Sequence, residues 1–177
     1  MSKKLILLAI VAVLTVSNSF AQAKFEKGDK ALNAGIGLGW DNYGYDLSPI
    51  PSFNASFEAG IVELPNVGVI SAGGFGAFRF APYSDGDGVY TYTIVAARGV
   101  FHFQFFDTGD FDLYAGIQSG IGYSNWNYDY DAWDYSDTYF VDDAFVGARW
   151  MKNDKFGFFA ELGYGISYLK AGITLKF

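Results

Sequence analysis

The last eight residues, Lys170 to Phe177, read KAGITLKF and alternate between two kinds of side chain. Ala171, Ile173 and Leu175 share one parity with the terminal phenylalanine, whereas lysine, glycine and threonine occupy the other. Successive side chains point to opposite faces of a β-strand, so this pattern predicts a strand with one apolar face. The fold follows from how often the pattern recurs.

The same two-residue period recurs along the chain, with apolar residues on one parity and glycine, polar or charged residues on the other. In the fourth segment Tyr90, Tyr92 and Ile94 fall on the charged parity and blur its first half. Strands of roughly ten residues suit a tilted crossing of a bilayer, and an even number returns the chain to its starting side. We expect eight strands, at 31–40, 52–61, 69–80, 90–103, 112–123, 144–150, 158–167 and 169–177.

The connections between these segments differ in composition at the two ends. Short turns are expected near Pro65, at 107–110 and at 152–154. Polar, acidic connections are expected at the opposite end, at 41–51, 81–88 and 125–137, and the last link at that end, around Ser167, is very tight. Short turns on one rim and longer loops on the other are typical of outer-membrane barrels. The fold class predicted is all-β, an eight-stranded up-and-down antiparallel transmembrane β-barrel.

The alternation by itself does not say which face is outside, because a soluble lipocalin-type barrel also alternates. The glycine-rich polar face would make a poor soluble surface, and only 18% of the chain is charged. The apolar face is expected to carry no charged residue across its middle. We therefore predict that this face contacts lipid and that barrel closure pairs the backbone polar groups.

The N-terminal residues have the features of a secretory signal peptide. Lys3 and Lys4 precede an apolar run at 5–14 that is too short for a membrane-spanning helix, and small residues follow. We predict a signal peptide at 1–23, cleaved after Ala21 or Ala23, and a barrel domain at 24–177. Cleavage takes the formal charge from −7 to −9, because both lysines leave, and this charge argues against nucleic acid as a partner.

The C-terminal stretch closely resembles the signal found at the end of bacterial outer-membrane barrels, in which polar, glycine, hydrophobic and aromatic residues hold fixed positions. Lys170, Gly172, Leu175 and Phe177 occupy those positions. The chain after residue 23 resembles the small eight-stranded outer-membrane family of OmpX-like, OmpA-like and OmpW-like barrels. The resemblance implies recognition by the outer-membrane insertion machinery and a place in the outer membrane of a Gram-negative bacterium. It also implies extracellular loops, periplasmic termini, and contact with membrane lipid and lipopolysaccharide.

The polar parity places charges of both signs inside the predicted barrel, where an unpaired ion is costly. We predict an ion-pair plug centred on Glu161, with Arg149 and Arg98 as its partners. The alternative is a narrow, porin-like or OmpW-like channel for small solutes. The predicted lumen network consists of Glu58, Arg79, Arg98, Arg149 and Glu161.

The sequence does not predict an enzyme. General-base chemistry most often uses histidine, and the single histidine of the chain, His102, lies at the turn end of its strand. The sequence places no serine or carboxylate beside it. We expect His102 to make a hydrogen bond in the lumen, and we predict no catalytic residues.

The connection around residues 126–135 is rich in aromatic residues and aspartates. Its aromatic residues suit a binding surface for an extracellular protein or glycan, or else an aromatic extension of the sheet above the bilayer. Asp129, Asp131 and Asp134 are weak candidates for calcium, since they lack the glycine and glutamate of an EF-hand loop. No resident cofactor is predicted, although divalent cations that bridge to lipopolysaccharide fit the acidic loops. The aromatic candidates are Trp126, Tyr128, Tyr130, Trp133 and Tyr135.

Overall fold

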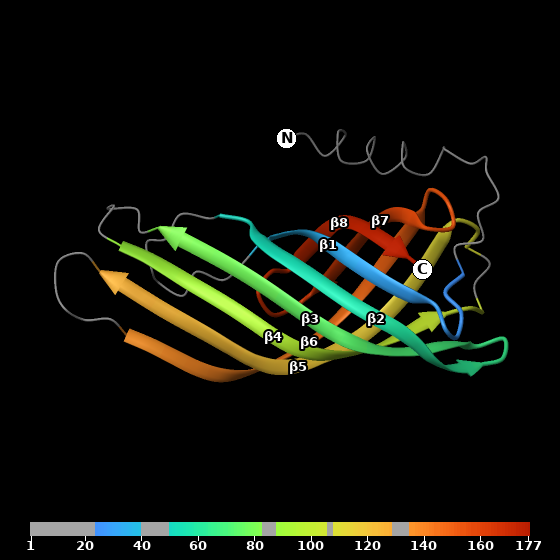
Figure 1. Cartoon of the computed structure of the whole chain (residues 1–177), viewed down its shortest axis with the longest axis horizontal. Coiled ribbons are helices and arrows are strands. Elements are labelled where there is room, and N and C mark those ends of the chain that lie inside the picture. Colours follow the sequence, from blue (N-terminus) through green and yellow to red (C-terminus); the bar gives the residue numbers. More distant parts are fainter. Residues whose placement is uncertain (1–23, 40–49, 83–87, 106–107, 129–134) are drawn as a thin grey trace.

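The computed structural model describes residues 24–39, 50–82, 88–105, 108–128 and 135–177. These residues form one closed barrel in which each strand pairs antiparallel with the next, and the last strand pairs with the first (Figure 1). The predicted fold class is confirmed. The strands are β1 (Lys30–Leu38), β2 (Ser52–Leu64), β3 (Gly68–Pro82), β4 (Gly88–Phe103), β5 (Phe111–Tyr128), β6 (Tyr135–Met151), β7 (Phe156–Gly163) and β8 (Leu169–Lys176).

The C-terminal strand closes the barrel. β8 pairs with β1 from Ala31 opposite Lys176 to Leu38 opposite Leu169, and the backbone N–H of Phe177 donates to the carbonyl of Lys30. Closure leaves neither β1 nor β8 as a free edge along this pairing. Within the described residues, no helix is long and apolar enough to span a membrane.

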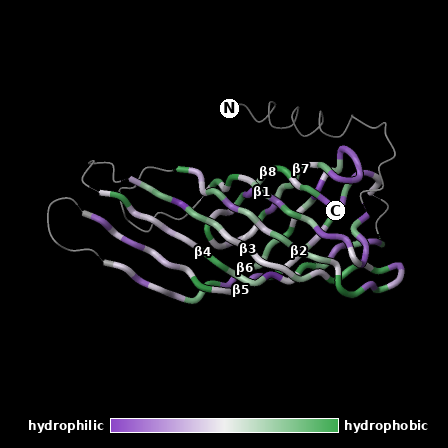
Figure 2. Tube along the Cα trace, in the orientation of Figure 1, coloured by the Kyte–Doolittle hydropathy of each residue, from purple (hydrophilic) through white to green (hydrophobic). Residues whose placement is uncertain are grey.

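The outer face of the barrel is apolar, as the alternation predicts. Ile117, Ile121 and Phe140 are among its most exposed side chains, at 70%, 60% and 72% exposed. Hydrophobic and hydrophilic residues follow one another along the strands in Figure 2. A surface of this kind is stable against hydrocarbon and is far more apolar than a soluble protein allows.

Aromatic residues lie at both ends of this apolar face. On the side of the short turns, Trp150 stacks on Phe158, and Phe101 contacts Phe103 edge to face. On the loop side, Tyr164 contacts Tyr168 at the tip of the β7–β8 turn. Aromatic rings favour the headgroup level of a bilayer, so the two girdles support the transmembrane interpretation.

One prediction about the outer face is wrong. Asp142 is exposed on that face, beside Ser119 of β5, between Phe140 and Ala144. The error arises because the sixth strand was expected to begin at residue 144, whereas β6 begins at Tyr135. The fifth strand likewise runs on to Tyr128, so most of the predicted loop at 125–137 is sheet.

The strands differ greatly in length, and this makes the barrel asymmetric. β5 and β6 have 18 and 17 residues, whereas β7 and β8 have eight each. β3 to β6 therefore project beyond their neighbours on the loop side, at the left of Figure 1. β6 pairs with β7 only from Phe145 to Met151. No described residue pairs with the β7-facing edge of 135–144.

Candidate functional site

The turn-side half of the lumen contains a network of charged side chains built around Arg149 on β6. Its guanidinium contacts Glu58 of β2 and lies 2.9 Å from an oxygen of Asp112 of β5. It also donates a 3.3 Å hydrogen bond to Asn33 of β1. All four side chains are buried, so two carboxylates and an amide compensate the cost of placing the guanidinium inside the barrel.

This arrangement corrects the predicted pairing of Arg149 with Glu161. Across β6 and β7, Gly147 lies opposite Glu161 and Arg149 lies opposite Phe159. The two charged residues are therefore diagonal, as expected, but Arg149 pairs with the carboxylates of β2 and β5 instead. Tyr114 packs against Gly147, where any larger side chain would meet its ring, and the Arg149 guanidinium lies 4.5 Å from that ring's centre.

His102 extends this network through two hydrogen bonds. Its Nδ1 lies 3.0 Å from Asp112, and its Nε2 lies 3.1 Å from the hydroxyl of Ser71. The structure thus brings a serine and a carboxylate to the histidine, which the sequence did not predict. The Ser71 hydroxyl donates to Glu58 at 2.9 Å, and all of these side chains are buried. Because the Ser71 hydroxyl already bonds to both Glu58 and His102, we interpret this series of hydrogen bonds as structural.

A second group of charges lies around Glu161 on β7. Arg98 of β4 donates to its carboxylate at 2.8 Å, so these two residues of the predicted plug are in contact. Lys170 of β8 lies 3.7 Å from Glu161, and the hydroxyl of Tyr114 donates to it at 3.1 Å. The Arg98 guanidinium also lies 4.3 Å from the ring centre of Phe145.

Asp143 on β6 completes this second group and was missed by sequence reasoning. It lies 3.4 Å from Lys170, accepts a 3.0 Å hydrogen bond from Gln118, and accepts another from the backbone N–H of Tyr164. It shares the parity of Arg149, so a longer sixth strand would have placed it in the lumen. Asp112 lay on the predicted polar parity, yet nothing in the sequence paired it with Arg149.

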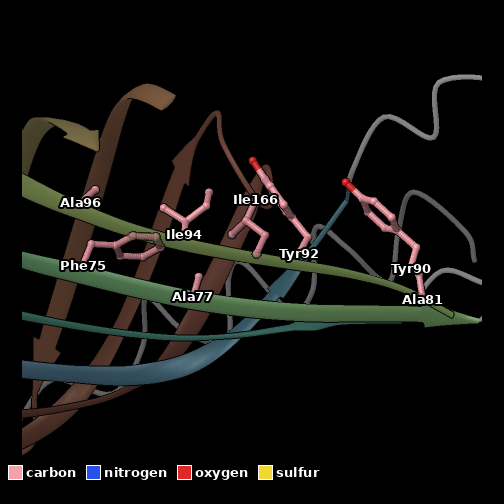
Figure 3. Close-up of a cluster of buried hydrophobic side chains, with 8 residues drawn as sticks. All are labelled: Phe75, Ala77, Ala81, Tyr90, Tyr92, Ile94, Ala96 and Ile166. Atoms are coloured by element: carbon pink, nitrogen blue, oxygen red, sulfur yellow. The ribbon is translucent and has the colours of Figure 1, made fainter. Parts of the chain in front are cut away.

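The loop-side half of the lumen contains the largest apolar cluster of the barrel. Tyr90 and Tyr92 face inward together with Ile94, and this explains why they fall on the charged parity. Trp126 and Tyr139 pack against the same group. Figure 3 shows the side chains of this cluster projecting from β3 and β4 toward Ile166 of the β7–β8 turn. The cluster comprises Phe75, Ala77, Ala81, Tyr90, Tyr92, Ile94, Ala96 and Ile166.

Arg79 belongs to this loop-side half and not to the charged network predicted for it. Its Nη2 donates a 2.7 Å hydrogen bond to the hydroxyl of Ser167, which lies 2.8 Å from the hydroxyl of Ser52. Arg79 is 2% exposed. The structure therefore separates it from Glu58 and Glu161, the two carboxylates predicted for the same network.

The predicted aromatic surface is divided by the structure. Trp126 and Tyr128 belong to β5 and Tyr135 to β6, while Tyr130 and Trp133 lie outside the described residues. The weak metal candidates Asp129, Asp131 and Asp134 also lie outside them. Where the chain is described, no three histidine, cysteine or acidic residues are grouped to hold a metal ion.

The residues of the predicted insertion signal take both faces of β8. Lys170 points into the lumen, where it contacts Asp143 and Glu161, whereas Leu175 and Phe177 are exposed on the apolar face. Gly172 lies opposite Gly35 of β1.

No protein-family model and no curated protein matches the chain. Two crystal structures of Ail, the attachment invasion locus protein of Yersinia pestis, are similar to it, one of them in complex with the heparin analogue sucrose octasulfate. Each is 18% identical, and the match covers 86% of this chain and 100% of Ail, with TM-scores of 0.52 and 0.54. The Ail outer membrane protein in a phospholipid bilayer nanodisc also matches, at 19% identity, over 85% of this chain and 100% of Ail, with a TM-score of 0.45.

At this level of identity the likeness concerns the fold. The chain has the eight-stranded barrel fold of Ail, and the predicted resemblance to small outer-membrane barrels is confirmed in that respect.

Proposed function

We propose that the chain is an integral barrel of the outer membrane of a Gram-negative bacterium, with extracellular loops and periplasmic termini. The apolar outer face with aromatic girdles at both ends supports this placement, since such a surface needs a hydrocarbon environment. The start of β1 and the end of β8 lie on the same side of the barrel as the short turns. This arrangement suits a periplasmic location for that side. In this proposal Lys170, Gly172, Leu175 and Phe177 form the signal read by the insertion machinery.

Lipopolysaccharide is the expected neighbour on the extracellular side. The described lysines and arginines lie either in the lumen, as Lys170 and Arg79 do, or on the turn side, as Lys152 and Lys176 do. The described loop-side outer face therefore exposes carboxylates, such as that of Asp142, and no lysine or arginine side chain. We infer that contact with lipopolysaccharide phosphates is bridged by divalent cations.

The lumen is proposed to be sealed and not to conduct solutes. The network around Arg149 and the group around Glu161 draw side chains from all eight strands. The apolar cluster of Figure 3 lies on the loop side of both groups. A sealed lumen predicts no stepwise currents in planar bilayers. Stable currents in the wild-type protein would support the narrow channel instead.

We propose that the barrel acts at the cell surface by binding an extended polypeptide along β6. The observation that carries this proposal is that the β7-facing edge of β6, at 135–144, pairs with no described residue. An open edge offers backbone N–H and C=O groups to an incoming strand. The side chains of Ser136, Asp137 and Thr138 are exposed along it, so the partner reaches the edge without displacing a packed core.

Charge selects the class of partner. Asp137 and Asp142 are exposed near this edge, whereas no described lysine or arginine is exposed on the loop-side half. A basic segment is therefore favoured. The sulfate groups of a ligand such as the sucrose octasulfate held by Ail would need cations that this edge does not present.

The test measures peptide binding to the barrel in lipid nanodiscs. The probe is a peptide of alternating lysine and valine, compared with a glutamate–valine peptide and with a lysine–valine peptide whose backbone is N-methylated at every second residue. We expect only the first to bind, because N-methylation removes the hydrogen bonds of an added strand. Equal binding of the N-methylated peptide would contradict strand addition, and equal binding of the glutamate peptide would contradict charge selection.

Matched variants locate the site. Asp142→Lys and Asp137→Lys are expected to weaken binding of the lysine–valine peptide at least tenfold, through like-charge repulsion. Asp154→Lys, an exposed aspartate on the turn side, is the control and is expected to leave binding unchanged. Equal loss in the control would indicate nonspecific attraction to an acidic protein.

A further inference from the structure

The first residues described, Lys24 to Asp29, cross the turn-side mouth of the barrel before β1 begins. The segment is tied to β2 at one point, where the N–H of Gly28 donates to the carbonyl of Gly60 and the N–H of Gly60 donates to the carbonyl of Asp29. Its own turn is closed by the N–H of Asp29, which donates to Glu26. The N-terminal segment therefore reaches the mouth as a short loop anchored at its end.

Phe25 is inserted from this segment into the barrel. Its side chain is 2% exposed, and its ring stacks on that of His102 with centroids 4.0 Å apart and an angle of 14° between the planes. Ala31 and Val69 form a small buried cluster with it. Above the ring lies the Arg149 guanidinium, 5.6 Å from its centre. Phe25 thus covers the turn-side face of the charged network.

Few contacts hold the rest of the segment. Gln104, just after β4, donates a 2.8 Å hydrogen bond to the carbonyl of Phe25, and the Lys176 ammonium donates one to the carbonyl of Lys24. The side chains of Glu26 and Lys27 are exposed. Gly28 has φ +96°, a conformation that glycine adopts without strain. A segment held by one buried ring, with a glycine at its base, can bind to the barrel mouth and leave it as a single piece.

We propose that residues 24–29 form a hinged strap that closes the periplasmic mouth of the lumen, with His102 as the seat of Phe25. Release about Gly28 admits water and small solutes to His102 and Val69 from the turn side. The group around Glu161 stays closed in this state, so release changes access to the lumen without opening a path through it. The strap is a second seal, and its role does not depend on the proposed binding of a partner at β6.

The chain contains no cysteine, which allows a direct test. Val69 is fully buried beneath the strap, so Val69→Cys places a single thiol at the covered position. The probe is a charged, water-soluble maleimide applied to the barrel folded in lipid vesicles that expose the turn side. We expect Val69→Cys alone to react slowly, and Val69→Cys with Phe25→Ala to react at least tenfold faster. Val69→Cys with Gln104→Ala is expected to fall between the two.

Controls separate release of the strap from general loosening of the barrel. Phe105→Ala removes an exposed turn-side aromatic outside the seat, and Lys27→Ala changes the strap without touching its anchor. Combined with Val69→Cys, both are expected to react as slowly as Val69→Cys alone. Heat-modifiable gel migration verifies that every variant is folded.

Three results would contradict the proposal. Equal labelling rates with and without Phe25→Ala would mean that the strap does not cover the mouth. A rate for Val69→Cys alone that matches the unfolded protein would mean that Phe25 is not seated. Currents through the Phe25→Ala barrel would contradict the separate seal at Glu161, even if labelling rises as expected.

Discussion

The two halves of the barrel interior differ in the main contacts that fill them: ion pairs dominate on the turn side, and the largest apolar cluster lies on the loop side. On the turn side, Arg149 holds Glu58 and Asp112 together. On the loop side, Tyr92 packs on Tyr139 with rings nearly parallel, and Ile94 lies beneath them. A charged interior needs each partner at a set position, whereas an apolar one needs only matching volume. We therefore expect the turn-side half to be the more sensitive to substitution.

The largest loss of stability is expected from Arg149→Met. The variant leaves Glu58 and Asp112 buried without their cation, which costs about 3–5 kcal/mol for a buried pair that loses one member. Urea unfolding of the barrel folded in lipid vesicles measures the loss. Adding Glu58→Gln and Asp112→Asn is expected to restore most of the stability, because no uncompensated charge then remains. A triple variant no more stable than Arg149→Met would contradict the charge-based account.

A smaller loss is expected from Ile94→Ala in the loop-side half. Ile94 is buried in the apolar cluster, and removing its side chain leaves a cavity that costs about 3 kcal/mol. Val95→Ala, on the lipid-facing side of the same strand, is the matched control, since Val95 is 67% exposed. The same unfolding assay compares them. Equal losses for the two would mean that the cluster contributes no more than the outer face.

Gly147→Ala tests how closely the charged half is packed. A Cβ at this position would meet the ring of Tyr114, which lies beside Arg149. Overpacking of this kind costs about 2 kcal/mol. Gly99→Ala is the control, because a Cβ there would have no atom within 4 Å. If Tyr114→Phe does not change the cost, the clash involves the ring and not its hydroxyl.

The smallest effect is expected from Ser52→Ala. The variant removes the hydrogen bond between Ser52 and Ser167 near the loop-side opening, a neutral pair worth about 1 kcal/mol. Because Arg79 also donates to Ser167, that hydroxyl keeps a partner. A loss of stability as large as that of Arg149→Met would show that the loop-side half depends on its polar contacts. It would contradict the expectation that the turn-side half is the more sensitive to substitution.

The alternation of residues along the chain was sufficient to predict the barrel and which face is apolar. The segment at 169–177 shows why: Ile173 and Leu175 share one parity and Lys170 and Thr174 the other, and a strand must separate them. Alternation also placed Glu58, Arg98, Arg149 and Glu161 inside, since their parity is opposite to that of the apolar residues. It failed at β6, where Asp137 was assigned to a loop and Asp142 and Asp143 lie before the predicted start of the strand at residue 144.

Only the tertiary structure decided which charges meet and which edge stays open. Arg149 and its partners are 37 and 91 residues apart in sequence, so their contact depends on the register of several strands at once. Phe25 reaches His102 only because closure brings the N-terminal segment to the end of β4. Strand periodicity is a local property that each segment expresses alone, whereas pairing across the lumen depends on closure and shear, which belong to the whole barrel.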